Sequence, residues 1–330
     1  MKYFLLAGTF LCFAGSLYAV DEASLSQPKN TENKKPAIGY IEQERTTTVQ
    51  KQTVNENECG QYRRPLRVAT FVTNPPLGWA DVVEGAYSKN YTNAGFSIKY
   101  FTELAEQNNM YVKSVPFPSY MDAVKALNRG DIDVLAGAYY DPKIIRNNVA
   151  PIYPSYINNP FVVVFKKGKE KPVQNFDDLK GLNGLVREEE LIYPLIYPSL
   201  PSGLSLKQIS GATTAYTALL DESADYLLTG LYAAEAEIRR FKLMDDVVVG
   251  EQALTQPELF FVGNKSNHCE KAFETISNTL HAVQNNKADK QKKIIAEIDD
   301  WGKRFANEPS LPEQLAEQTN ASSAQPVPKQ

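Results

Sequence analysis

The stretch Ala126-Leu127-Asn128-Arg129-Gly130-Asp131-Ile132-Asp133-Val134-Leu135 has a partial copy later in the chain, Ala218-Leu219 followed by Asp225-Tyr226-Leu227. In each copy an amphipathic helical segment reaches a polar bend, and an apolar run of strand character follows at once. This order predicts the helix-then-buried-strand half of an α/β unit, twice. Two similar α/β lobes are therefore expected, and a ligand cleft is expected between them.

Composition fits a soluble chain with one or two sizeable cores. The sequence has 330 residues, 43% of them hydrophobic and 22% charged, with a formal net charge of -4. Nucleic-acid binding is disfavoured, because the mildly acidic balance and the lack of a long Lys/Arg run provide no basic stripe to neutralise phosphates.

The amino terminus reads as a secretory signal. Lys2 is followed by an apolar stretch from Phe4 to Leu17 and by the small residue Ala19, before the polar Asp21. This order predicts a signal peptide over residues 1–19 that is cleaved on export, and hence a periplasmic location. The apolar segment is short for a membrane span, which needs roughly 20 residues.

Both ends of the chain outside the lobes are polar and lack an apolar period. Residues 20–58 are rich in Lys, Gln, Asn and Thr, and residues 307–330 in Pro, Gln, Ser and Ala. Both segments are expected to be disordered. The arm over 20–58 is either a tolerated tail or a docking segment for a partner.

Between these tails, alternating strand and helix patterns place one lobe at residues 59–163 and 258–306 and the other at 164–257. The runs Asn159 to Phe165 and Glu258 to Gly263 suit two crossover strands that act as a hinge. The expected strands are Leu66 to Phe71, Tyr111 to Pro116 and Ile132 to Leu135, and the expected helices Ile98 to Gln107, Tyr120 to Leu127, Ala272 to Val283 and Lys290 to Trp301.

After removal of the signal, two cysteines are left in an oxidising compartment. Cys59 precedes the first expected strand and Cys269 opens a late helix. A Cys59–Cys269 disulfide is the favoured interpretation; two unpaired thiols are the alternative, because sequence does not fix the geometry.

Over about residues 64 to 304 the chain resembles the periplasmic solute-binding proteins that deliver polar amino acids to ABC importers, the extracellular solute-binding protein family 3. The matching segments, in order, are Leu66-Arg67-Val68-Ala69-Thr70, Asn74-Pro75-Pro76-Leu77, Gly95-Phe96-Ser97-Ile98, Ala126 to Val134, Tyr153-Pro154-Ser155-Tyr156, Phe176 to Gly181 and Trp301-Gly302. The resemblance implies a type II periplasmic binding protein fold, two α/β lobes joined by two crossover strands.

The chain departs from the family at each part of its amino-acid clamp. The family's Thr-Pro-Glu-Arg turn corresponds to Asp141-Pro142-Lys143-Ile144-Ile145-Arg146, in which an acid replaces the threonine and the arginine arrives two residues late. Glu188-Glu189-Glu190 replaces the Gly-Thr turn, which would fill an anion site at a helix start with the protein's own charge. The amine-binding acid falls near Thr229 or Gly230, and the family's acids at the first helix start fall on Ser97 and Lys99.

These changes predict that an ordinary α-amino acid is not bound in the family's manner, because Asp141 would repel its carboxylate. Aromatic and acidic walls would suit a cationic or sugar-like ligand; alternatively, the tyrosines plug a cleft that has lost its ligand. Arg146 could still reach a ligand. The expected ligand-binding residues are Leu77, Trp79, Tyr139, Asp141, Arg146, Glu189, Glu190, Tyr193 and Thr229, with Tyr140 and Tyr197 on the same predicted loops.

Enzymatic activity is disfavoured. His268 and His281 are the only histidines and lie far in sequence from the expected cleft, and no metal, phosphate-loop or nucleophile motif is present. We therefore expect no cofactor, no metal and no catalytic residue. One alternative is a proton-transfer dehydratase that uses a cleft carboxylate such as Glu189.

Two functions from different classes remain open. The first is an exported receptor that captures a small ligand by hinge closure, with an ABC importer permease as partner. The second is a non-transporting relative recruited as a structural component of a cell-envelope or secretion assembly, with residues 20–58 as the contact to other envelope proteins. The lost clamp and the long arm favour the second, whereas the intact two-lobe pattern and the expected hinge favour the first. The receptor is the favoured interpretation, because reception is the commonest use of such a fold, and the structural component is its alternative.

Overall fold

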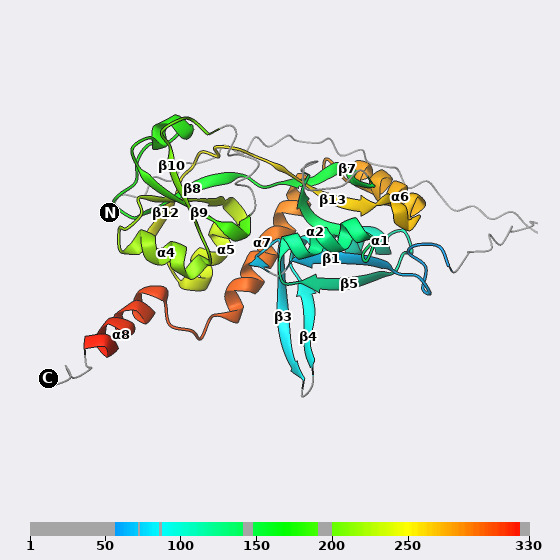
Figure 1. The fold of residues 1–330 in the computed structure, drawn as a ribbon, viewed down its shortest axis with the longest axis horizontal. Helices are drawn as coiled ribbons and strands as arrows, with labels where there is room; N and C mark the ends of the chain where they lie inside the picture. Colours follow the sequence, from blue (N-terminus) through cyan, green and yellow to red (C-terminus); the bar gives the residue numbers. More distant parts are fainter. Residues whose placement is uncertain (1–56, 72, 86–87, 141–147, 191–199, 324–330) are drawn as a thin grey trace, which may run out of the picture. The chain divides into compact units, whose positions relative to one another are not determined.

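The computed structural model describes residues 57–71, 73–85, 88–140, 148–190 and 200–323; within these ranges it leaves the side chains of 80–93, 189 and 321–323 undescribed. The described residues form two five-stranded sheets and one three-stranded sheet (Figure 1). The elements given below all belong to one compact unit, Thr53–Gln330. We call the part built on the first five-stranded sheet lobe one and the part built on the second lobe two.

The lobe-one sheet has the strand order β5-β1-β6-β13-β7. β1 pairs in parallel with both β5 and β6, whereas β13 runs antiparallel to β6 and β7. The strands are β1 (Leu66–Phe71), β5 (Val112–Phe117), β6 (Val134–Tyr139), β7 (Val149–Asn158) and β13 (Glu258–Asn264). Every residue of β6 is buried, as expected for a strand covered on both faces.

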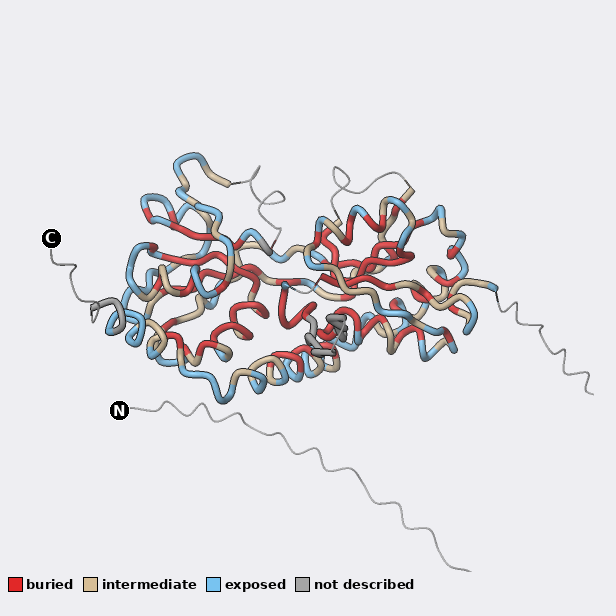
Figure 2. Tube along the Cα trace, turned by 60° about the horizontal axis from the view of Figure 1, so that its bottom comes forward, coloured by how far each residue is buried: buried red, intermediate tan, exposed pale blue. Residues whose placement is uncertain are grey.

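The lobe-two sheet repeats this plan in the order β10-β9-β11-β8-β12. β9 pairs in parallel with β10 and β11, and β8 runs antiparallel to β11 and β12. The strands are β8 (Phe161–Lys166), β9 (Asn183–Arg187), β10 (Ser205–Ile209), β11 (Tyr226–Gly230) and β12 (Val247–Val249). Figure 2 shows the buried residues gathered in the interior and the exposed residues along the outer turns.

The helices cover these sheets. Lobe one carries α1 (Phe96–Glu106), α2 (Tyr120–Arg129) and α6 (Glu270–Ala282); lobe two carries α4 (Ala212–Leu220) and α5 (Leu231–Phe241). The described residues also form α7 (Lys287–Arg304), α8 (Leu311–Ser323) and the 3-10 turns η1 (Phe176–Leu179), η2 (Glu188–Glu190) and η4 (Lys265–Asn267). In the part of the chain that the structure describes, no helix combines the length and apolar character needed to span a membrane.

The sequence repeat is confirmed and has a structural reason. α2 leads into β6 and α4 leads into β11, and each of these strands is the central one of its sheet. The repeated aspartates do the same work: Asp133 accepts a hydrogen bond from the backbone N–H of Arg67 at 2.8 Å, and Asp225 from that of Asn183 at 2.7 Å. Each carboxylate therefore fixes the beginning of the neighbouring parallel strand.

A long hairpin was not expected from the sequence. β3 (Gly78–Gly85) and β4 (Ser88–Ala94) pair antiparallel over their whole length, and the short β2 (Thr73–Asn74) pairs with the beginning of β3. Figure 1 shows this hairpin leading away from the lobe-one sheet. Its base positions Trp79 in the interior of the protein.

Two segments that connect the lobes lie side by side, at Asn159-Pro160 and at 255–257, whereas the strands expected to cross over, β8 and β13, belong to one sheet each. The Asn159 N–H donates to the Pro257 carbonyl at 2.9 Å and the Phe161 N–H to the Thr255 carbonyl at 2.8 Å. β8 joins the lobe-two sheet from Phe161 onward, so the first passage between lobes lies at Asn159-Pro160, slightly earlier than the sequence predicted.

The carboxyl-terminal segment makes a third connection between the lobes. α7 contacts α1 of lobe one through the Lys99–Glu297 ion pair at 2.5 Å and contacts α5 of lobe two through the Arg239–Asp299 ion pair. The chain then continues onto lobe two, where the Lys242 ammonium donates to the Ala306 carbonyl at 2.9 Å.

Residues 307–330 were expected to be disordered; instead α8 occupies 311–323 and packs on α4. Leu311, 1% exposed, supplies the apolar contact that stabilises this helix.

Replacing Leu311 by alanine should lower the free energy of unfolding by about 2 kcal/mol, because the side chain is fully buried against the lobe-two helices and leaves a cavity when it is removed. Urea unfolding followed by circular dichroism measures the change. Glu317→Ala, an exposed position on the same helix, is the matched control and should change stability by less than about 0.5 kcal/mol. Equal stability of Leu311→Ala and wild type would contradict the docked position of α8.

Candidate functional site

A buried carboxylate occupies the part of lobe two where the ligand clamp was expected. Glu190, 3% exposed, ends the η2 turn that follows β9. Its Oε2 accepts the Gly230 N–H at 2.7 Å, and its Oε1 accepts the Arg187 Nε–H at 2.8 Å and the Thr229 hydroxyl. Gly230 is the N-cap of α5, so the carboxylate also lies at the positive end of a helix dipole.

Arg187 links this carboxylate to a second one. Its Nη1 lies 4.0 Å from Oε1 of Glu237 on α5, and the Glu237 Oε2 is 3.2 Å from Nη1 of Arg240. Burial would lower the pKa of the Arg187 guanidinium, but the carboxylates of Glu190 and Glu237 more than offset this and hold the pKa above its usual range. Burial raises the pKa of the Glu237 carboxyl, an effect opposed by Arg187 and Arg240. We call these four charged residues the lobe-two charge cluster.

Thus two predicted ligand-binding residues, Glu190 and Thr229, come together, but they bind each other. An anion that entered this position would have to displace Glu190 from three donors. The η2 turn also lies against β2 of lobe one, which brings the beginning of the β3 hairpin close to the cluster.

The predicted lobe-one residues lie in the protein interior. Leu77, 2% exposed, belongs to the main core cluster. Tyr139 is buried at the end of β6, where its hydroxyl accepts a hydrogen bond from the Asn159 side-chain amide at 2.7 Å. Burial raises the pKa of the Tyr139 phenol well above its usual range, so this group is a neutral hydrogen-bonding partner of the hinge.

Trp79 packs against α7. Its ring centroid is 5.5 Å from that of Trp301, and the Arg304 guanidinium lies 4.5 Å from the Trp79 centroid. Arg240 of the lobe-two charge cluster lies over the Trp301 ring at 5.7 Å and over Phe305 at 4.7 Å. A series of ring–ring and arginine–ring contacts therefore runs from β3 through α7 to α5 of lobe two.

The other predicted positions lie outside the described residues. These are Asp141, Arg146, Tyr193 and Tyr197, together with the side chain of Glu189. The two lobe-one positions that correspond to family acids have partners of their own: the Ser97 hydroxyl is 2.7 Å from the Tyr156 hydroxyl, and Lys99 pairs with Glu297.

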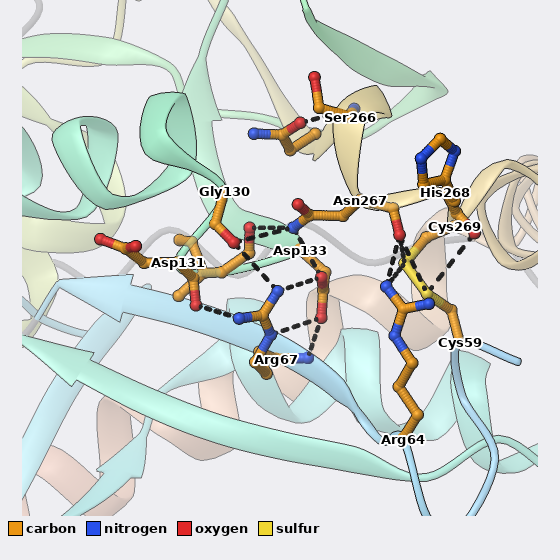
Figure 3. A network of polar contacts seen from close by, with 12 residues as sticks. Cys59, Arg64, Arg67, Gly130, Asp131, Asp133, Ser266, Asn267, His268 and Cys269 are labelled. Carbon is orange, nitrogen blue, oxygen red and sulfur yellow. Dashed lines mark hydrogen bonds and ion pairs between the residues drawn. A yellow bond between two sulfur atoms is a disulfide. The ribbon is translucent and has the colours of Figure 1, made fainter. Parts of the chain in front are cut away.

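The Cys59–Cys269 disulfide is present, with a Cα–Cα distance of 5.3 Å (Figure 3). Beside it, Asp133 accepts the Arg67 Nη2–H at 2.7 Å and the Asn267 side-chain N–H at 2.8 Å. This polar network stabilises the start of β1 and the turn before α6, and it contains no residue of the predicted ligand set.

Sequence reasoning missed Arg187 and Glu237. The signals were present: Arg187 ends the apolar run Gly184-Leu185-Val186 directly before three glutamates, and Glu237 stands on the apolar side of its helix between Ala233 and Phe241. A charged residue on an apolar face predicts a buried partner of opposite charge.

No protein-family model matches the sequence, and no curated protein sequence is significantly similar to it. Solved structures do match. The GluR0 ligand-binding core in complex with L-glutamate is 16% identical with a TM-score of 0.55, over 72% of this chain and 97% of that one. The amino acid ABC transporter substrate-binding protein AbpA from Streptococcus pneumoniae, bound to L-arginine, is 15% identical with a TM-score of 0.54, over 74% and 97%.

A histidine kinase sensor domain with similarity to periplasmic binding proteins is 17% identical with a TM-score of 0.55, over 72% of this chain and 96% of that one. At these identities the likeness is one of fold. The protein therefore has the two-lobed α/β fold of the periplasmic solute-binding proteins, which confirms the fold that the sequence resemblance implied.

Proposed function

We propose that this protein is an exported solute-binding-fold protein that does not carry a free α-amino acid, and that it works as a non-transporting component of a cell-envelope assembly. The observation that carries the proposal is the position of Glu190, whose carboxylate already takes the donors of Arg187, Thr229 and Gly230. A ligand carboxylate at this point would add a second negative charge, and repulsion in a partly desolvated cleft is on the order of several kcal/mol.

The link through α7 and α8 supports the same function. Capture by hinge closure requires one lobe to rotate against the other. Here α7 is paired with α1 through Glu297 and with α5 through Asp299, and α8 is docked on lobe two. A chain held together in this way presents a constant surface to a protein partner without a ligand.

Export and partner contact belong to the proposal as well. The signal over residues 1–19 would direct the chain to the periplasm, and the arm over 20–58 would contact other envelope proteins. The proposal includes no catalytic step; the solved structures of similar fold given above are binding and sensor proteins, which supports a function without catalysis.

A hinge-closing receptor, partnered by an ABC importer permease, is the second candidate. Among the described residues, several buried polar atoms near the strand ends have no hydrogen-bond partner, namely Thr70 Oγ1, Trp79 Nε1, Asn159 Oδ1 and Arg187 Nη2. Buried polar groups are normally satisfied, so a small polar ligand held between the lobes would supply the missing contacts.

A thermal-shift screen of the mature chain against amino acids, polyamines, sugars and small acids tests both candidates, because a ligand that binds the native state raises its melting temperature. The proposal expects no shift with any α-amino acid. A shift that Thr70→Val abolishes would establish the receptor instead, since this change removes an unpartnered hydroxyl while keeping the side-chain shape.

Co-purification tests the partner. The full chain and a variant that lacks residues 20–58 but keeps its signal would be cross-linked in cells and recovered from the envelope. The proposal expects a defined set of envelope proteins with the full chain and their loss with the variant. Recovery of the same proteins by both chains would place the contact elsewhere.

A further inference from the structure

A cavity of about 390 Å³ lies beside the hinge. Both lobes line it: β7 of lobe one, Pro160 and Gln256 of the two crossover segments, Tyr232 at the start of α5, and the first turn of α7. Of the predicted ligand-binding residues whose side chains the structure describes, Leu77, Trp79, Tyr139, Glu190 and Thr229, none lines it. The volume falls in the range of small-molecule sites, roughly 300 to 1,000 Å³.

Lys290 is the unusual residue of this cavity. It is only 8% exposed, yet no carboxylate of the described residues lies within ion-pair distance of its ammonium group; the contact recorded for it is with the Tyr100 ring, 5.9 Å from the centroid. Burial lowers the pKa of this group, with a further contribution from Lys287. A partly desolvated ammonium without a counter-charge is unfavourable for the folded protein unless an anion compensates it.

The position of Lys290 on its helix adds to this cost. Lys287 and Lys290 both lie in the first turn of the 18-residue helix α7, where the helix dipole is positive and favours negative charge. Lys287 lines the same cavity. Asp289, the acid of this turn, pairs with Lys293 at 3.2 Å. The two lysines that line the cavity repel each other and the dipole, and one anion bound beside them would relieve both effects.

The remaining lining groups indicate the kind of anion. The neutral side chains of Asn158, Gln256, Gln284 and Gln291 offer donors and acceptors for hydroxyl groups, and the carboxylate that lines the cavity is Glu258, which accepts the Ser155 hydroxyl at 2.8 Å. Two ammonium groups and one carboxylate leave a single positive charge. This charge matches a monoanion better than a dianion.

We infer that the hinge cavity is a binding site for a small hydroxylated monocarboxylate, such as a sugar acid, with its carboxylate at Lys290 and Lys287 and its hydroxyl groups at the side-chain amides. Because both lobes line the cavity, such a ligand stabilises the arrangement of the hinge. The inference is independent of the function proposed above, which concerns the cleft at Glu190.

Isothermal titration calorimetry of the mature full chain at constant ionic strength tests the site, with gluconate as the probe, and glucose and inorganic phosphate as comparisons. We expect saturable binding of gluconate, none of glucose, and phosphate at least tenfold weaker than gluconate. Lys290→Met keeps the aliphatic part of the side chain but removes the charge, and should lower the affinity for gluconate at least tenfold. Without ligand this variant should melt at or above the wild-type temperature, because an uncompensated buried charge has gone.

Lys292→Met is the matched control, an exposed lysine on the same helix that does not line the cavity, and it should bind gluconate as wild type does. If both variants weakened gluconate binding equally, the loss would follow from the lower positive charge of the protein as a whole and would not support a site at Lys290. Undetectable gluconate binding, or equal binding of glucose, would overturn the site, and tighter binding of phosphate would overturn the assignment to a monocarboxylate.

Discussion

Glu190→Ala is expected to lower the free energy of unfolding by about 3 to 5 kcal/mol, because removal of one partner from a buried ion pair leaves the other charge uncompensated. Arg187 and Glu190 are each 3% exposed, and Glu237, at 4.0 Å, compensates the arginine only in part. The Thr229 hydroxyl and the Gly230 N–H also lose their acceptor. The melting temperature should fall by about 10 °C.

Glu188→Ala is the control for this prediction. Glu188 lies in the same short turn and carries the same charge, but it is exposed. Its replacement should change stability by less than about 0.5 kcal/mol. Equal losses in the two variants would show that the charge cluster does not hold Glu190 as the structure describes.

Added acetate tests whether the Glu190 carboxylate occupies an anion-binding position or only fills space in the core. In Glu190→Ala the donors of Arg187, Thr229 and Gly230 would surround a vacant carboxylate position. Acetate should therefore raise the melting temperature of this variant more than chloride at equal ionic strength, by mass action on the folded state, and should have no such effect on wild type. Equal responses to the two salts would mean that neighbouring side chains have filled the space left by the Glu190 carboxylate, so that no anion can bind there.

Much of the fold could be predicted because its strands are buried on both faces. Runs such as Phe161 to Phe165 and Leu259 to Val262 are apolar without interruption, and short apolar runs between turn residues indicate strands of a covered sheet. The polar bend after the helix of the first copy was also predicted, and it contains a glycine. Gly130 ends α2 with a φ of 82°, in the left-handed region, and a Cβ there would lie 2.7 Å from the Asn267 Oδ1.

The hairpin β3–β4 and helix α8 could not be predicted, because neither has a strong local pattern. α8 has one fully buried leucine, Leu311, among mainly polar residues, so its position depends on the surface that α4 and α5 present. β3 and β4 pair with each other over their whole length, while only β2, a strand of two residues, extends their sheet. Both elements depend on contacts that a single sequence window does not contain.

The site was predicted in part. The acid triplet at Glu188 was expected to fill an anion position with the protein's own charge, and Glu190 does accept a helix N-terminal N–H. That N–H belongs to Gly230 at the start of α5, a helix distant in sequence, so local pattern could not identify it. Trp79 was expected on a ligand-facing wall, but it packs on Trp301 and Arg304 because α7 returns to the base of the hairpin.

Removal of the disulfide is the second large expected effect. In the double variant Cys59→Ser, Cys269→Ser the free energy of unfolding should fall by about 2 to 5 kcal/mol. The disulfide joins residues 210 apart and so strongly restricts the unfolded chain. If this chain entropy dominates, the loss should lie at the upper end of the range. Thermal unfolding with and without a reductant measures the change. Reductant should bring wild type to the melting temperature of the double variant, and should leave the double variant unchanged.

Amide hydrogen exchange shows which strands are destabilised when the disulfide is reduced. The disulfide fixes the segment before β1 to the start of α6, and the hydrogen bonds from Tyr111 N–H to Gly60 O and from Leu66 N–H to Tyr111 O continue that attachment into the lobe-one sheet. Reduction should therefore first decrease protection in β1 and β5, while β9 and β11 of lobe two keep theirs. Simultaneous loss in both lobes would show that α7 and α8 couple the lobes into one unfolding unit. The same helices would then oppose the hinge motion that a solute carrier needs, so this outcome also bears on the choice between the two candidate functions.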